Sequence, residues 1–378
     1  GLDNDCDGTA DSVCADTDWT WVDGSVTGSV AGVYGTADDM PGSRYLPATW
    51  TDSSGNFWLF GGRGYDSSGV YGYLNDLWKY DGTDWTWISG AETEGSYTDP
   101  DHPNARYAAS YWIDGSDNLW MFGGRGFDSS GNLGYLNDLW KFDGVSQSWA
   151  LVEGAIDVSD QSGTYTALGS TGVPGGRRGA TSWIDASGDL WLFGGIGYDG
   201  PGVSGELNDL WTYDVSGSNW IWIGGSSNAD QAGSYGIAGL NYPGGRHYAT
   251  SLIDSNGDVW LFGGTGFGDS GTSGYLNDLW KFSGGYWSWE KGSSTVDSLG
   301  TYGTLGESAP GNEPSARYVP NAWIDDSNQL WLFGGYGYDP SGSGVVGAFN
   351  DLWMFDGTDW AWMGGTTNLD SQGAYGTQ

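Results

Sequence analysis

Cysteine, histidine and positive charge are all scarce in this sequence. Only two of its 378 residues are cysteines, Cys6 and Cys14, and only two are histidines, His102 and His247. Lys and Arg together number 12 against 48 Asp and Glu, which gives a formal net charge of −36. Such a charge repels phosphate backbones and anionic lipids, so we expect no nucleic-acid partner.

Long apolar runs are absent as well. No segment approaches the roughly 20 apolar residues that a membrane-spanning helix needs, and no lipidation motif is present, so we expect no membrane insertion. The 70 Gly residues, with many Ser and Asp, would suit a disordered linker, but the 25 Trp exclude one. Disordered segments are poor in large aromatic side chains because they bury no core.

The sequence is rich in repetition. The stretch "YLNDLWKY" at 73–80 returns as "YLNDLWKF" at 135, "ELNDLWTY" at 206, "YLNDLWKF" at 275 and "AFNDLWMF" at 348. Each copy is preceded by an Arg, so the repeats start near 44, 106, 177, 246 and 317. A period of about 70 residues indicates a repeat architecture, in which each unit buries its apolar faces against its neighbours.

Each repeat contains four short segments with the patterns of β-strands. A segment rich in small residues, such as "RYAASYW", precedes a continuously apolar one, such as "LWMFGG", which needs cover on both faces. The alternating "NDLWKY" type and a "WTW" type follow, with turn-forming Asp, Ser and Gly between the strands. Four antiparallel strands per repeat predict an all-β fold made of propeller blades. Because the Trp residues recur at the same places in every copy, we expect them to pack between blades.

The repeats resemble the kelch family. In every copy a Pro lies three residues before the Arg, as in Pro41 and Arg44, and an apolar strand, Gly-Gly and a Trp follow. The resemblance covers about residues 44 to 362 and implies a kelch-type β-propeller of five complete repeats, plus one extra N-terminal outer strand at 19–21. Some kelch propellers resemble copper radical oxidases or sialic acid epimerases. The oxidase chemistry requires a Cys within the propeller, which this chain lacks, so we expect neither copper nor an organic cofactor.

The ends of the chain predict two parts. Residues 1–16 form an acidic segment, and residues 17–378 form the propeller. The three strands that would complete the blade of strand 19–21 would lie beyond residue 378, so we expect a piece of a longer protein with at least six blades, or missing strands supplied by another copy. Five blades with one spare strand are the alternative.

The acidic segment has the pattern of a calcium loop. "DNDCDGTAD" offers oxygen ligands at Asp3, Asp5, Asp7, Thr9 and Asp11, which match the front half of an EF-hand-type loop. It resembles the Asp-Asn-Asp-Cys-Asp-Gly repeats of secreted bacterial proteins, which implies bound calcium. Cys14 stands where a bidentate Glu should be, and a solvated acidic tail is the alternative.

Both cysteines lie in this segment. A disulfide between Cys6 and Cys14 would close the loop and would indicate an oxidising compartment. Pairing with residues upstream of Gly1 is the alternative. We therefore expect an extracellular or cell-surface location.

Five Arg and five Asp residues occur once in every repeat. We expect each Arg to lie at the entry of an innermost strand and to pair with the Asp of the "ND" motif, as a structural element rather than an anion site. The pairs form a ring of charges: Arg44, Arg106, Arg177, Arg246 and Arg317, with Asp76, Asp138, Asp209, Asp278 and Asp351.

Residues that break the repeat are better functional candidates. Arg178 and His247 stand beside the Arg anchor where the other copies have Tyr, and Arg63 and Arg125 follow Gly-Gly where other copies have uncharged residues. An asymmetric patch of these four side chains could bind an acidic sugar. Ordinary surface variation is the alternative.

The long connectors vary far more than the strands, and in an up-and-down blade they lie on one face. Variable loops on a rigid scaffold are typical of recognition. The sequence therefore favours a secreted or cell-surface, non-enzymatic recognition or adhesion module that binds a glycan or an extracellular protein. The alternative is a structural subunit of a calcium-linked extracellular assembly, which assembles through its unmatched terminal strands. We rank a carbohydrate-active enzyme below both.

Overall fold

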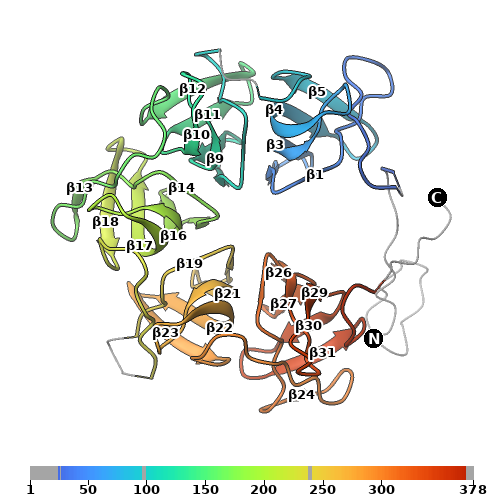
Figure 1. The fold of residues 1–378 in the computed structure, drawn as a ribbon, viewed down its shortest axis with the longest axis vertical. Helices are drawn as coiled ribbons and strands as arrows, with labels where there is room; N and C mark the ends of the chain where they lie inside the picture. Colours follow the sequence, from blue (N-terminus) through green and yellow to red (C-terminus); the bar gives the residue numbers. More distant parts are fainter. Residues whose placement is uncertain (1–23, 26, 96–98, 237–240, 372–378) are drawn as a thin grey trace.

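The computed structural model describes residues 24, 25, 27–95, 99–236 and 241–371. Within these ranges the chain forms 31 β-strands and no helix, so it contains no helix long and apolar enough to cross a membrane. Figure 1 shows five groups of strands arranged in an open ring around a central opening. The predicted all-β propeller of antiparallel four-stranded blades is thus confirmed.

The blades follow one another along the chain, and we number them accordingly. Blade 1 consists of β1 (Arg44–Tyr45), β2 (Ala48–Thr51), β3 (Phe57–Tyr65), β4 (Tyr71–Tyr80) and β5 (Trp85–Ser89). Blade 2 consists of β6 (Arg106–Tyr107), β7 (Ser110–Ile113), β8 (Leu119–Phe122), β9 (Arg125–Phe127), β10 (Leu133–Tyr135), β11 (Leu139–Asp143) and β12 (Ser148–Glu153). Blade 3 consists of β13 (Ser170–Gly172), β14 (Arg177–Arg178), β15 (Thr181–Ile184), β16 (Leu190–Tyr198), β17 (Ser204–Asp214) and β18 (Asn219–Gly224).

The last two blades have the same plan. Blade 4 consists of β19 (Arg246–His247), β20 (Thr250–Ile253), β21 (Val259–Phe267), β22 (Ser273–Ser283) and β23 (Tyr286–Lys291). Blade 5 consists of β24 (Ser308–Ala309), β25 (Arg317–Tyr318), β26 (Asn321–Ile324), β27 (Leu330–Phe333), β28 (Tyr336–Tyr338), β29 (Val346–Ala348), β30 (Leu352–Phe355) and β31 (Trp360–Gly364).

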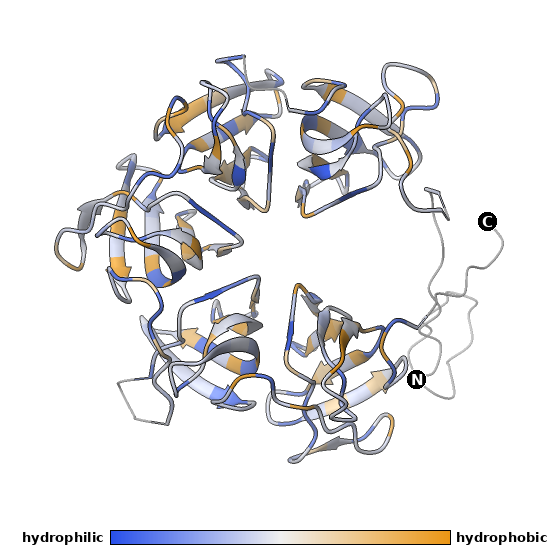
Figure 2. Cartoon of the chain, viewed as in Figure 1, coloured by the Kyte–Doolittle hydropathy of each residue, from blue (hydrophilic) through white to orange (hydrophobic). Residues whose placement is uncertain are grey.

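The innermost strand of each blade is divided into two short pieces. In blade 1, β1 and β2 both pair with β3 on the same side. The break falls at Leu46, whose φ of 49° lies in the left-handed region, and Ala108, Gly179, Tyr248 and Val319 adopt the same conformation in the other blades. The kink turns the inner loop towards the central opening, where Figure 2 shows hydrophilic stretches on several of these loops.

Two blades carry an additional edge strand that the sequence pattern did not predict. β13 pairs with β18, and β24 pairs with β31, so the connectors that lead into blades 3 and 5 cover the outer edges of those blades. The connectors have no alternating pattern of their own. Their pairing follows from the unsatisfied backbone groups that the outermost strand offers.

The core lies between the blades. Each interface joins one face of a blade, here called its forward face, to the opposite, rear face of the next blade. The innermost strand contributes Trp50, Trp112, Trp183 or Leu252 to the forward face. Between blades 1 and 2, Trp50, Trp58 and Phe60 of the forward face meet Met121 and Trp140 of the rear face. The expected packing of Trp between blades is therefore found in all four interfaces.

A chain of backbone hydrogen bonds links the innermost kinks. The amide of Ala108 donates to the carbonyl of Leu46 at 2.9 Å, and Gly179 donates to Ala108 at 2.8 Å. Tyr248 then donates to Gly179 at 2.8 Å, and Val319 donates to Tyr248 at 3.1 Å. The blades are thereby joined at the axis as well as through their side chains.

Candidate functional site

Each Arg of the repeat is buried in its own blade and pairs with the Asp expected from the sequence. In blade 2, the Arg106 Nη1 and Nη2 atoms donate to the two carboxylate oxygens of Asp138 at 2.6 and 2.7 Å. The remaining donors of this guanidinium reach the carbonyls of Asn104 and Gly123. The same bidentate pair occurs in the other four blades, with N–O distances of 2.6–2.9 Å. These side chains are 0–4% exposed, so they do not present charge to the central opening.

The Asp of each pair also joins the blade to its connector. Asp209 accepts a hydrogen bond from the Trp211 indole nitrogen at 2.6 Å and one from the Tyr165 hydroxyl at 2.6 Å. Tyr34, Tyr235 and Tyr302 make the equivalent bond in blades 1, 4 and 5, whereas Tyr97 lies outside the described residues. Burial, reinforced by the negative charge of Asp209, raises the pKa of the Tyr165 phenol above its ordinary value. The pairs therefore form a framework and leave no free group for chemistry.

In each blade, three side chains from neighbouring strands form a row that runs outwards from the innermost strand. In blade 1 the row is Tyr45, Arg63 and Tyr73, which are direct cross-strand neighbours and so share one face of the sheet. The other rows are Tyr107–Arg125–Tyr135, Arg178–Ile196–Glu206, His247–Thr265–Tyr275 and Tyr318–Tyr336–Ala348. We call these the five inner rows.

The inner rows contact one another across the blade interfaces. The outermost member of one row meets the innermost member of the next: the rings of Tyr73 and Tyr107 lie 5.6 Å apart, and those of Tyr275 and Tyr318 lie 5.5 Å apart. Between blades 3 and 4, this position holds Glu206 and His247 instead. The Glu206 Oε2 atom lies 2.8 Å from His247 Nδ1. Here an acid and a base replace the pair of aromatic rings.

Three departures from the repeat and one residue of a variable kink come together at this junction. Arg178 and Glu206 belong to the row of blade 3, His247 belongs to the row of blade 4, and Tyr248 follows His247. The Arg178 guanidinium is hydrogen-bonded to the Tyr248 hydroxyl, and the rings of His247 and Tyr248 lie 4.6 Å apart. We call these four residues the junction cluster. Figure 1 shows β14, which carries Arg178, and β19, which carries His247, on the inner side of neighbouring blades.

The backbone of blade 3 makes room for Tyr248. The counterparts of Tyr248 in the other kinks are Leu46, Ala108, Gly179 and Val319. A Cβ atom on Gly179 would lie 2.6 Å from the Tyr248 ring, so only glycine fits beneath this ring. The ring also stacks on Tyr318 at 6.0 Å. Tyr248 is therefore held over the inner edge of blade 3, directed at Arg178.

Burial favours the neutral form of the Tyr248 phenol and of the adjacent Tyr107 phenol. Burial raises the pKa of Tyr248 above its ordinary value, and burial likewise raises the pKa of Tyr107. Arg178 lies over both rings, 5.5 Å from the centroid of Tyr248 and 5.6 Å from that of Tyr107. The Glu206 and His247 side chains keep 11% and 13% of their surface exposed. The junction cluster and the adjacent Tyr107 thus bring together a cation, two phenol hydroxyls and the Glu206–His247 pair.

Glu206 is fixed from the outer side by the connector. Its backbone amide donates to Asp230 Oδ1 at 2.8 Å, and the amide of Asp230 donates back to its carbonyl at 2.7 Å. Asp230 has a φ of 59°, and Asp160, Asp297 and Asp370 adopt the same left-handed conformation in other connectors. The variable connectors therefore share one fixed contact, which holds the outermost member of the inner row.

The four side chains proposed from the sequence as an acidic-sugar patch do not form one cluster. Arg178 and His247 belong to the junction cluster. Arg63 lies over the Tyr71 and Tyr73 rings, at 5.1 and 5.4 Å, and Arg125 lies over Tyr135. Tyrosine rings lie between Arg63, Arg125 and Arg178. Arg63 and Arg125 therefore add positive charge in blades 1 and 2 and are not part of the contact with His247.

Sequence reasoning missed Glu206 and Tyr248. The signal for Glu206 was visible, because Glu206 is the one charged residue at this position of the five copies, where the others have Tyr or Ala. The signal for Tyr248 was weaker, because the kink position varies in every blade. Neither position could be connected with His247 before the contact between blades was known.

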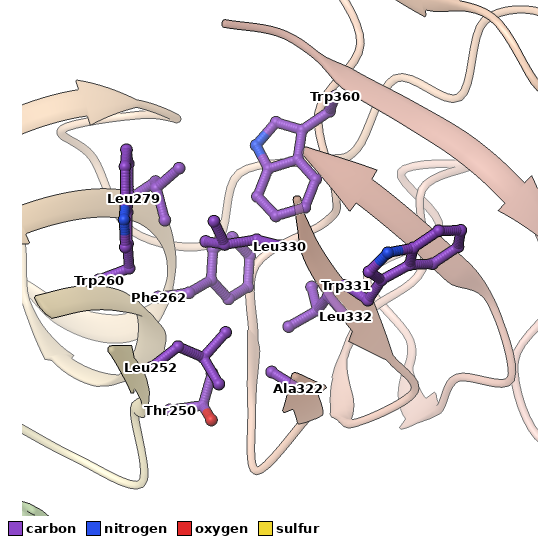
Figure 3. Close-up of a pocket in the computed structure, with 10 residues that line it drawn as sticks. All are labelled: Thr250, Leu252, Trp260, Phe262, Leu279, Ala322, Leu330, Trp331, Leu332 and Trp360. Atoms are coloured by element: carbon purple, nitrogen blue, oxygen red, sulfur yellow. The ribbon is translucent and has the colours of Figure 1, made fainter. Parts of the chain in front are cut away.

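A small pocket lies between blades 4 and 5, away from the junction cluster. Figure 3 shows its lining, which includes Leu252, Trp260, Phe262, Leu332 and Trp360. The space within it amounts to about 10 Å³, enough for one water molecule. The lining carries no titratable group, so we interpret this pocket as imperfect packing.

The calls on the N-terminal segment fall outside the described residues. They concern the calcium ligands Asp3, Asp5, Asp7, Thr9 and Asp11, the Cys6–Cys14 disulfide and the extra strand at 19–21. Within the described ranges, no group of three or more His, Cys, Asp or Glu side chains is arranged to hold a metal ion.

Comparisons with known proteins place sialic acid epimerases among the relatives. No family model matches the chain. N-acetylneuraminate epimerases from Escherichia coli O139:H28 and Shigella boydii serotype 4 are each 24% identical over 207 residues, which is 53% of this chain and 47% of theirs. The chain thus spans about half the length of the curated relatives that it matches. Among solved structures, that of YjhT has a TM-score of 0.53 and 17% identity, over 88% of this chain and 86% of the other, which supports the fold.

These relatives overturn one prediction from the sequence. The sequence analysis favoured a non-enzymatic recognition or adhesion module, because variable loops on a constant scaffold are typical of recognition. The curated relatives are named as enzymes that act on a sugar acid. Loop variability was a poor guide, because it does not distinguish loops that recognise a partner from loops that surround a catalytic site.

Proposed function

We propose that the protein is a carbohydrate-active enzyme that acts on an acidic sugar of the N-acetylneuraminate type, and that the junction cluster is its active site. One observation carries this proposal: four residues at repeat-breaking or variable positions, those of the junction cluster, converge at a single blade junction beside the central opening. The names of the relatives supply the substrate class.

Glu206 and His247 would perform the proton transfers. Epimerisation leaves the composition of the sugar unchanged, so each proton that the protein takes from the substrate must be balanced by one that it returns. A carboxylate and an imidazole joined at 2.8 Å can accept and release a proton together. An aromatic pair, as found between blades 1 and 2 and between blades 4 and 5, could not. Glu206 and His247 therefore give this junction a capacity for proton transfer that the aromatic pairs lack.

Arg178 would bind the carboxylate of the sugar. Its guanidinium is the charged group of the junction cluster best placed to neutralise an acid, and Arg63 and Arg125 add positive potential in blades 1 and 2. Guanidinium–carboxylate pairs are favoured because two parallel hydrogen bonds form. Tyr248 and Tyr107 would present neutral hydroxyls and ring faces to the sugar.

The proposal is tested by following the interconversion of N-acetylneuraminate epimers by NMR. We expect the protein to accelerate it, and Glu206→Gln and His247→Asn each to slow it by roughly 10²–10⁴-fold, the usual contribution of a general acid or base. Arg178→Met should mainly raise KM. Glu290→Gln, on the exposed side of β23, is the matched control and should retain full activity.

Two results would contradict the proposal. If the wild-type protein left the epimers at their spontaneous rate over a range of acidic sugars, the assignment as an enzyme of this class would fail. If it were active but Glu206→Gln and His247→Asn kept that activity, the reaction would occur elsewhere and the junction cluster would not be the site.

The finer predictions from the sequence are part of the same proposal. We infer that the repeat is of the kelch type, because the Gly-Gly, Arg and Asp positions form one buried framework in every blade. An extracellular or cell-surface location and a calcium-loaded N-terminal segment remain predictions. Calorimetric titration of the protein with and without residues 1–14 would test the calcium site.

A further inference from the structure

A groove of about 700 Å³ lies between blades 3 and 4, at the opposite end of the strands from the junction cluster. The β15–β16 hairpin forms one side and the β20–β21 hairpin forms the other, and the exposed Ser187 and Ser255 lie at its rim. The lining includes Phe282 and the parallel rings of Trp183 and Trp191, whose centroids lie 5.8 Å apart. Small-molecule sites commonly measure about 300–1,000 Å³, so the groove has the size of a ligand site.

In three blades, a lysine covers the tryptophan of the second long strand. The pairs are Lys79 over Trp58, Lys141 over Trp120 and Lys281 over Trp260, with the Nζ atom 5.1–5.3 Å from the ring centroid. Each lysine is the cross-strand neighbour of its tryptophan. The neighbour of Trp191 in blade 3 is Thr212, and that of Trp331 in blade 5 is Met354. The ring that lines the groove is therefore one that has no lysine of its own blade over it.

The carboxylates that accompany such a lysine are present in blade 3. In blade 4, the Lys281 Nζ atom lies 2.7 Å from Oδ2 of Asp258 in the adjoining hairpin, and Asp189 is the counterpart of Asp258. The Trp191 indole nitrogen donates to Asp185 Oδ2 at 2.9 Å, which places a second carboxylate at the edge of the ring. Among the described residues, neither Asp185 nor Asp189 forms an ion pair. Blade 3 thus keeps the acceptors of the lysine and lacks the lysine itself.

The hydroxyl group of Thr212 adds a further acceptor on this face. Thr212 is only 8% exposed, and its Oγ1 atom has no hydrogen-bond partner among the described residues. Buried hydroxyls are normally hydrogen-bonded. Because Thr212 and Trp191 are direct cross-strand neighbours, they share one face of the sheet. A donor placed over the Trp191 ring lies on the same face as this hydroxyl.

A hydrogen bond between hairpins closes two of the other interfaces. The Ser53 amide donates to Asp117 Oδ1 at 2.9 Å between blades 1 and 2, and the Ser255 amide donates to Asn328 Oδ1 at 2.8 Å between blades 4 and 5. The counterpart of Asp117 and Asn328 in blade 4 is Gly257, which lines the groove and has no side chain to reach blade 3. The hairpins of blades 3 and 4 are therefore not joined in this way.

The interface between blades 3 and 4 combines both differences. Between blades 2 and 3 the bridging position is also a glycine, Gly188, but Lys141 covers the tryptophan of blade 2. The interfaces that have the bridge also have the lysine, in blades 1 and 4. Of the four interfaces, the third alone has an aromatic ring and carboxylates without a lysine, in a groove that no side-chain bridge closes.

We propose that this groove is a binding site for a small aliphatic amine in its ammonium form. The ammonium lies over Trp191, as the lysine does in three other blades, and pairs with Asp185 and Asp189. Cations are attracted to the face of an indole ring, and a carboxylate beside the ring strengthens that preference. The aliphatic part of the ligand packs against Val259 and Phe282, which line the same groove.

The occupant is a free amine rather than a lysine side chain of a partner protein. The groove lies between two hairpins and has the volume of a small-molecule site, whereas a partner protein would need a broader surface. The net charge of −36 favours the approach of cations. The proposal does not depend on the proposed enzymatic function, since the groove and the junction cluster lie at opposite ends of the blades.

The test uses n-butylammonium, which reproduces the end of a lysine side chain, and neutral n-butanol as its counterpart. Both are titrated at neutral pH and constant ionic strength into protein labelled with ¹⁵N at tryptophan, and the indole N–H signals are followed by NMR. Trp191→Phe identifies the Trp191 signal. We expect a saturable shift of this signal with n-butylammonium and none with n-butanol. The Trp260 signal is the internal reference and should not move, because Lys281 already covers that ring.

Two variants should abolish the response without removing a contact. Thr212→Lys supplies the lysine of the other blades and should weaken n-butylammonium binding by roughly tenfold or more. Gly257→Asn restores the bridging side chain and should also weaken binding. The φ of Gly257 is 83°, which asparagine tolerates better than most residues, and a Cβ atom there would meet nothing within 4 Å.

Gly188→Asn is the matched control for Gly257→Asn. It places the same side chain at the same turn position in blade 3, where it faces blade 2, and a Cβ atom there also meets nothing within 4 Å. We expect this variant to bind n-butylammonium as the wild type does. Melting temperatures of all variants, measured alongside, show that the fold is retained.

Three outcomes would overturn the proposal. An equal shift of the Trp191 signal with n-butanol would mean that the groove does not recognise the charge. An unchanged response in folded Thr212→Lys protein would mean that the amine binds elsewhere. A shift produced by a lysine-containing tripeptide with blocked ends, but not by n-butylammonium, would mean that the site recognises a partner's lysine together with its backbone.

Discussion

A guanidinium removed from water needs a partner for each of its donors. Arg106 is 1% exposed, yet it meets a carboxylate in bidentate fashion and two backbone carbonyls besides. A buried pair of this kind adds little net stability over an apolar substitute, but breaking it leaves an uncompensated charge. Its value here is geometric, since Arg106 joins the innermost strand to the start of the third strand.

Replacing Arg106 with Ala should therefore destabilise the protein strongly. Asp138 would keep its hydrogen bond from Trp140 but would lose the guanidinium that neutralises it. We expect a loss of roughly 3–5 kcal/mol in the free energy of unfolding, measured by chemical denaturation.

Lys141→Ala is the control for Arg106→Ala. The Lys141 Nζ atom comes no closer than 4.0 Å to Asp114 Oδ2, and the Lys141 side chain is 34% exposed. Its removal should therefore lower the free energy of unfolding by about 0–1 kcal/mol. An Arg106→Ala protein as stable as the wild type would show that the pair is not structural. Lost substrate binding in such a protein would instead indicate that the Arg residues serve the central opening.

The individual residues also show what could and could not be predicted from the sequence. Arg106 and Asp138 could be paired in advance, because both recur in every copy at a constant spacing within one blade. Glu206 and His247 occur once each, and their contact crosses from one blade to the next. The arrangement of neighbouring blades, and not the local pattern, brings them together.

At the scale of the elements, the interface between blades 4 and 5 differs from the other three. The forward face carries Trp50, Trp112 or Trp183 in blades 1 to 3 but Leu252 in blade 4. The small pocket of Figure 3 lies beside Leu252. The Trp112 indole nitrogen also donates to the carbonyl of Trp183 in the next blade at 2.8 Å, a bond that Leu252 cannot make.

We expect Leu252→Trp to stabilise the protein by about 0.5–2 kcal/mol, the usual gain from filling a cavity. The larger ring would occupy the pocket and could donate to a backbone carbonyl of blade 5. Thermal unfolding monitored by circular dichroism measures the change, and Leu252→Ala should shift stability in the opposite direction. A lower melting temperature for Leu252→Trp would mean that blades 4 and 5 are already too close for the ring.

The four strands of each blade could be predicted because their patterns are intrinsic to the sequence: apolar runs, alternation and turn residues. The edge strands β13 and β24 could not. Their residues become strands because an outer strand of the blade offers free backbone groups, and nothing in "STG" or "SA" indicates this. Predictability thus decreases where structure depends on a neighbour rather than on local pattern.

At the scale of the whole molecule, the buried tyrosines give every blade with a described connector the same dependence on pH. Tyr34, Tyr165, Tyr235 and Tyr302 donate to the Asp residues of the Arg pairs. In each case burial, followed by the charge of the Asp, raises the pKa of the phenol above its ordinary value. In the unfolded chain these phenols ionise near pH 10.

The folded protein should therefore lose stability as the pH rises above about 10. In that range the unfolded chain has released the phenolic protons and the folded chain still holds them, so the free energy of unfolding falls by about 1.4 kcal/mol per pH unit for each retained proton. Urea denaturation between pH 8 and pH 11, values set about that phenolic pKa, measures the slope. Tyr165→Phe removes one titrating group and should make the slope shallower, although it lowers stability at neutral pH through the lost hydrogen bond to Asp209. The growing negative charge acts equally on both proteins, so equal slopes would show that general repulsion, and not the buried phenols, causes the alkaline loss.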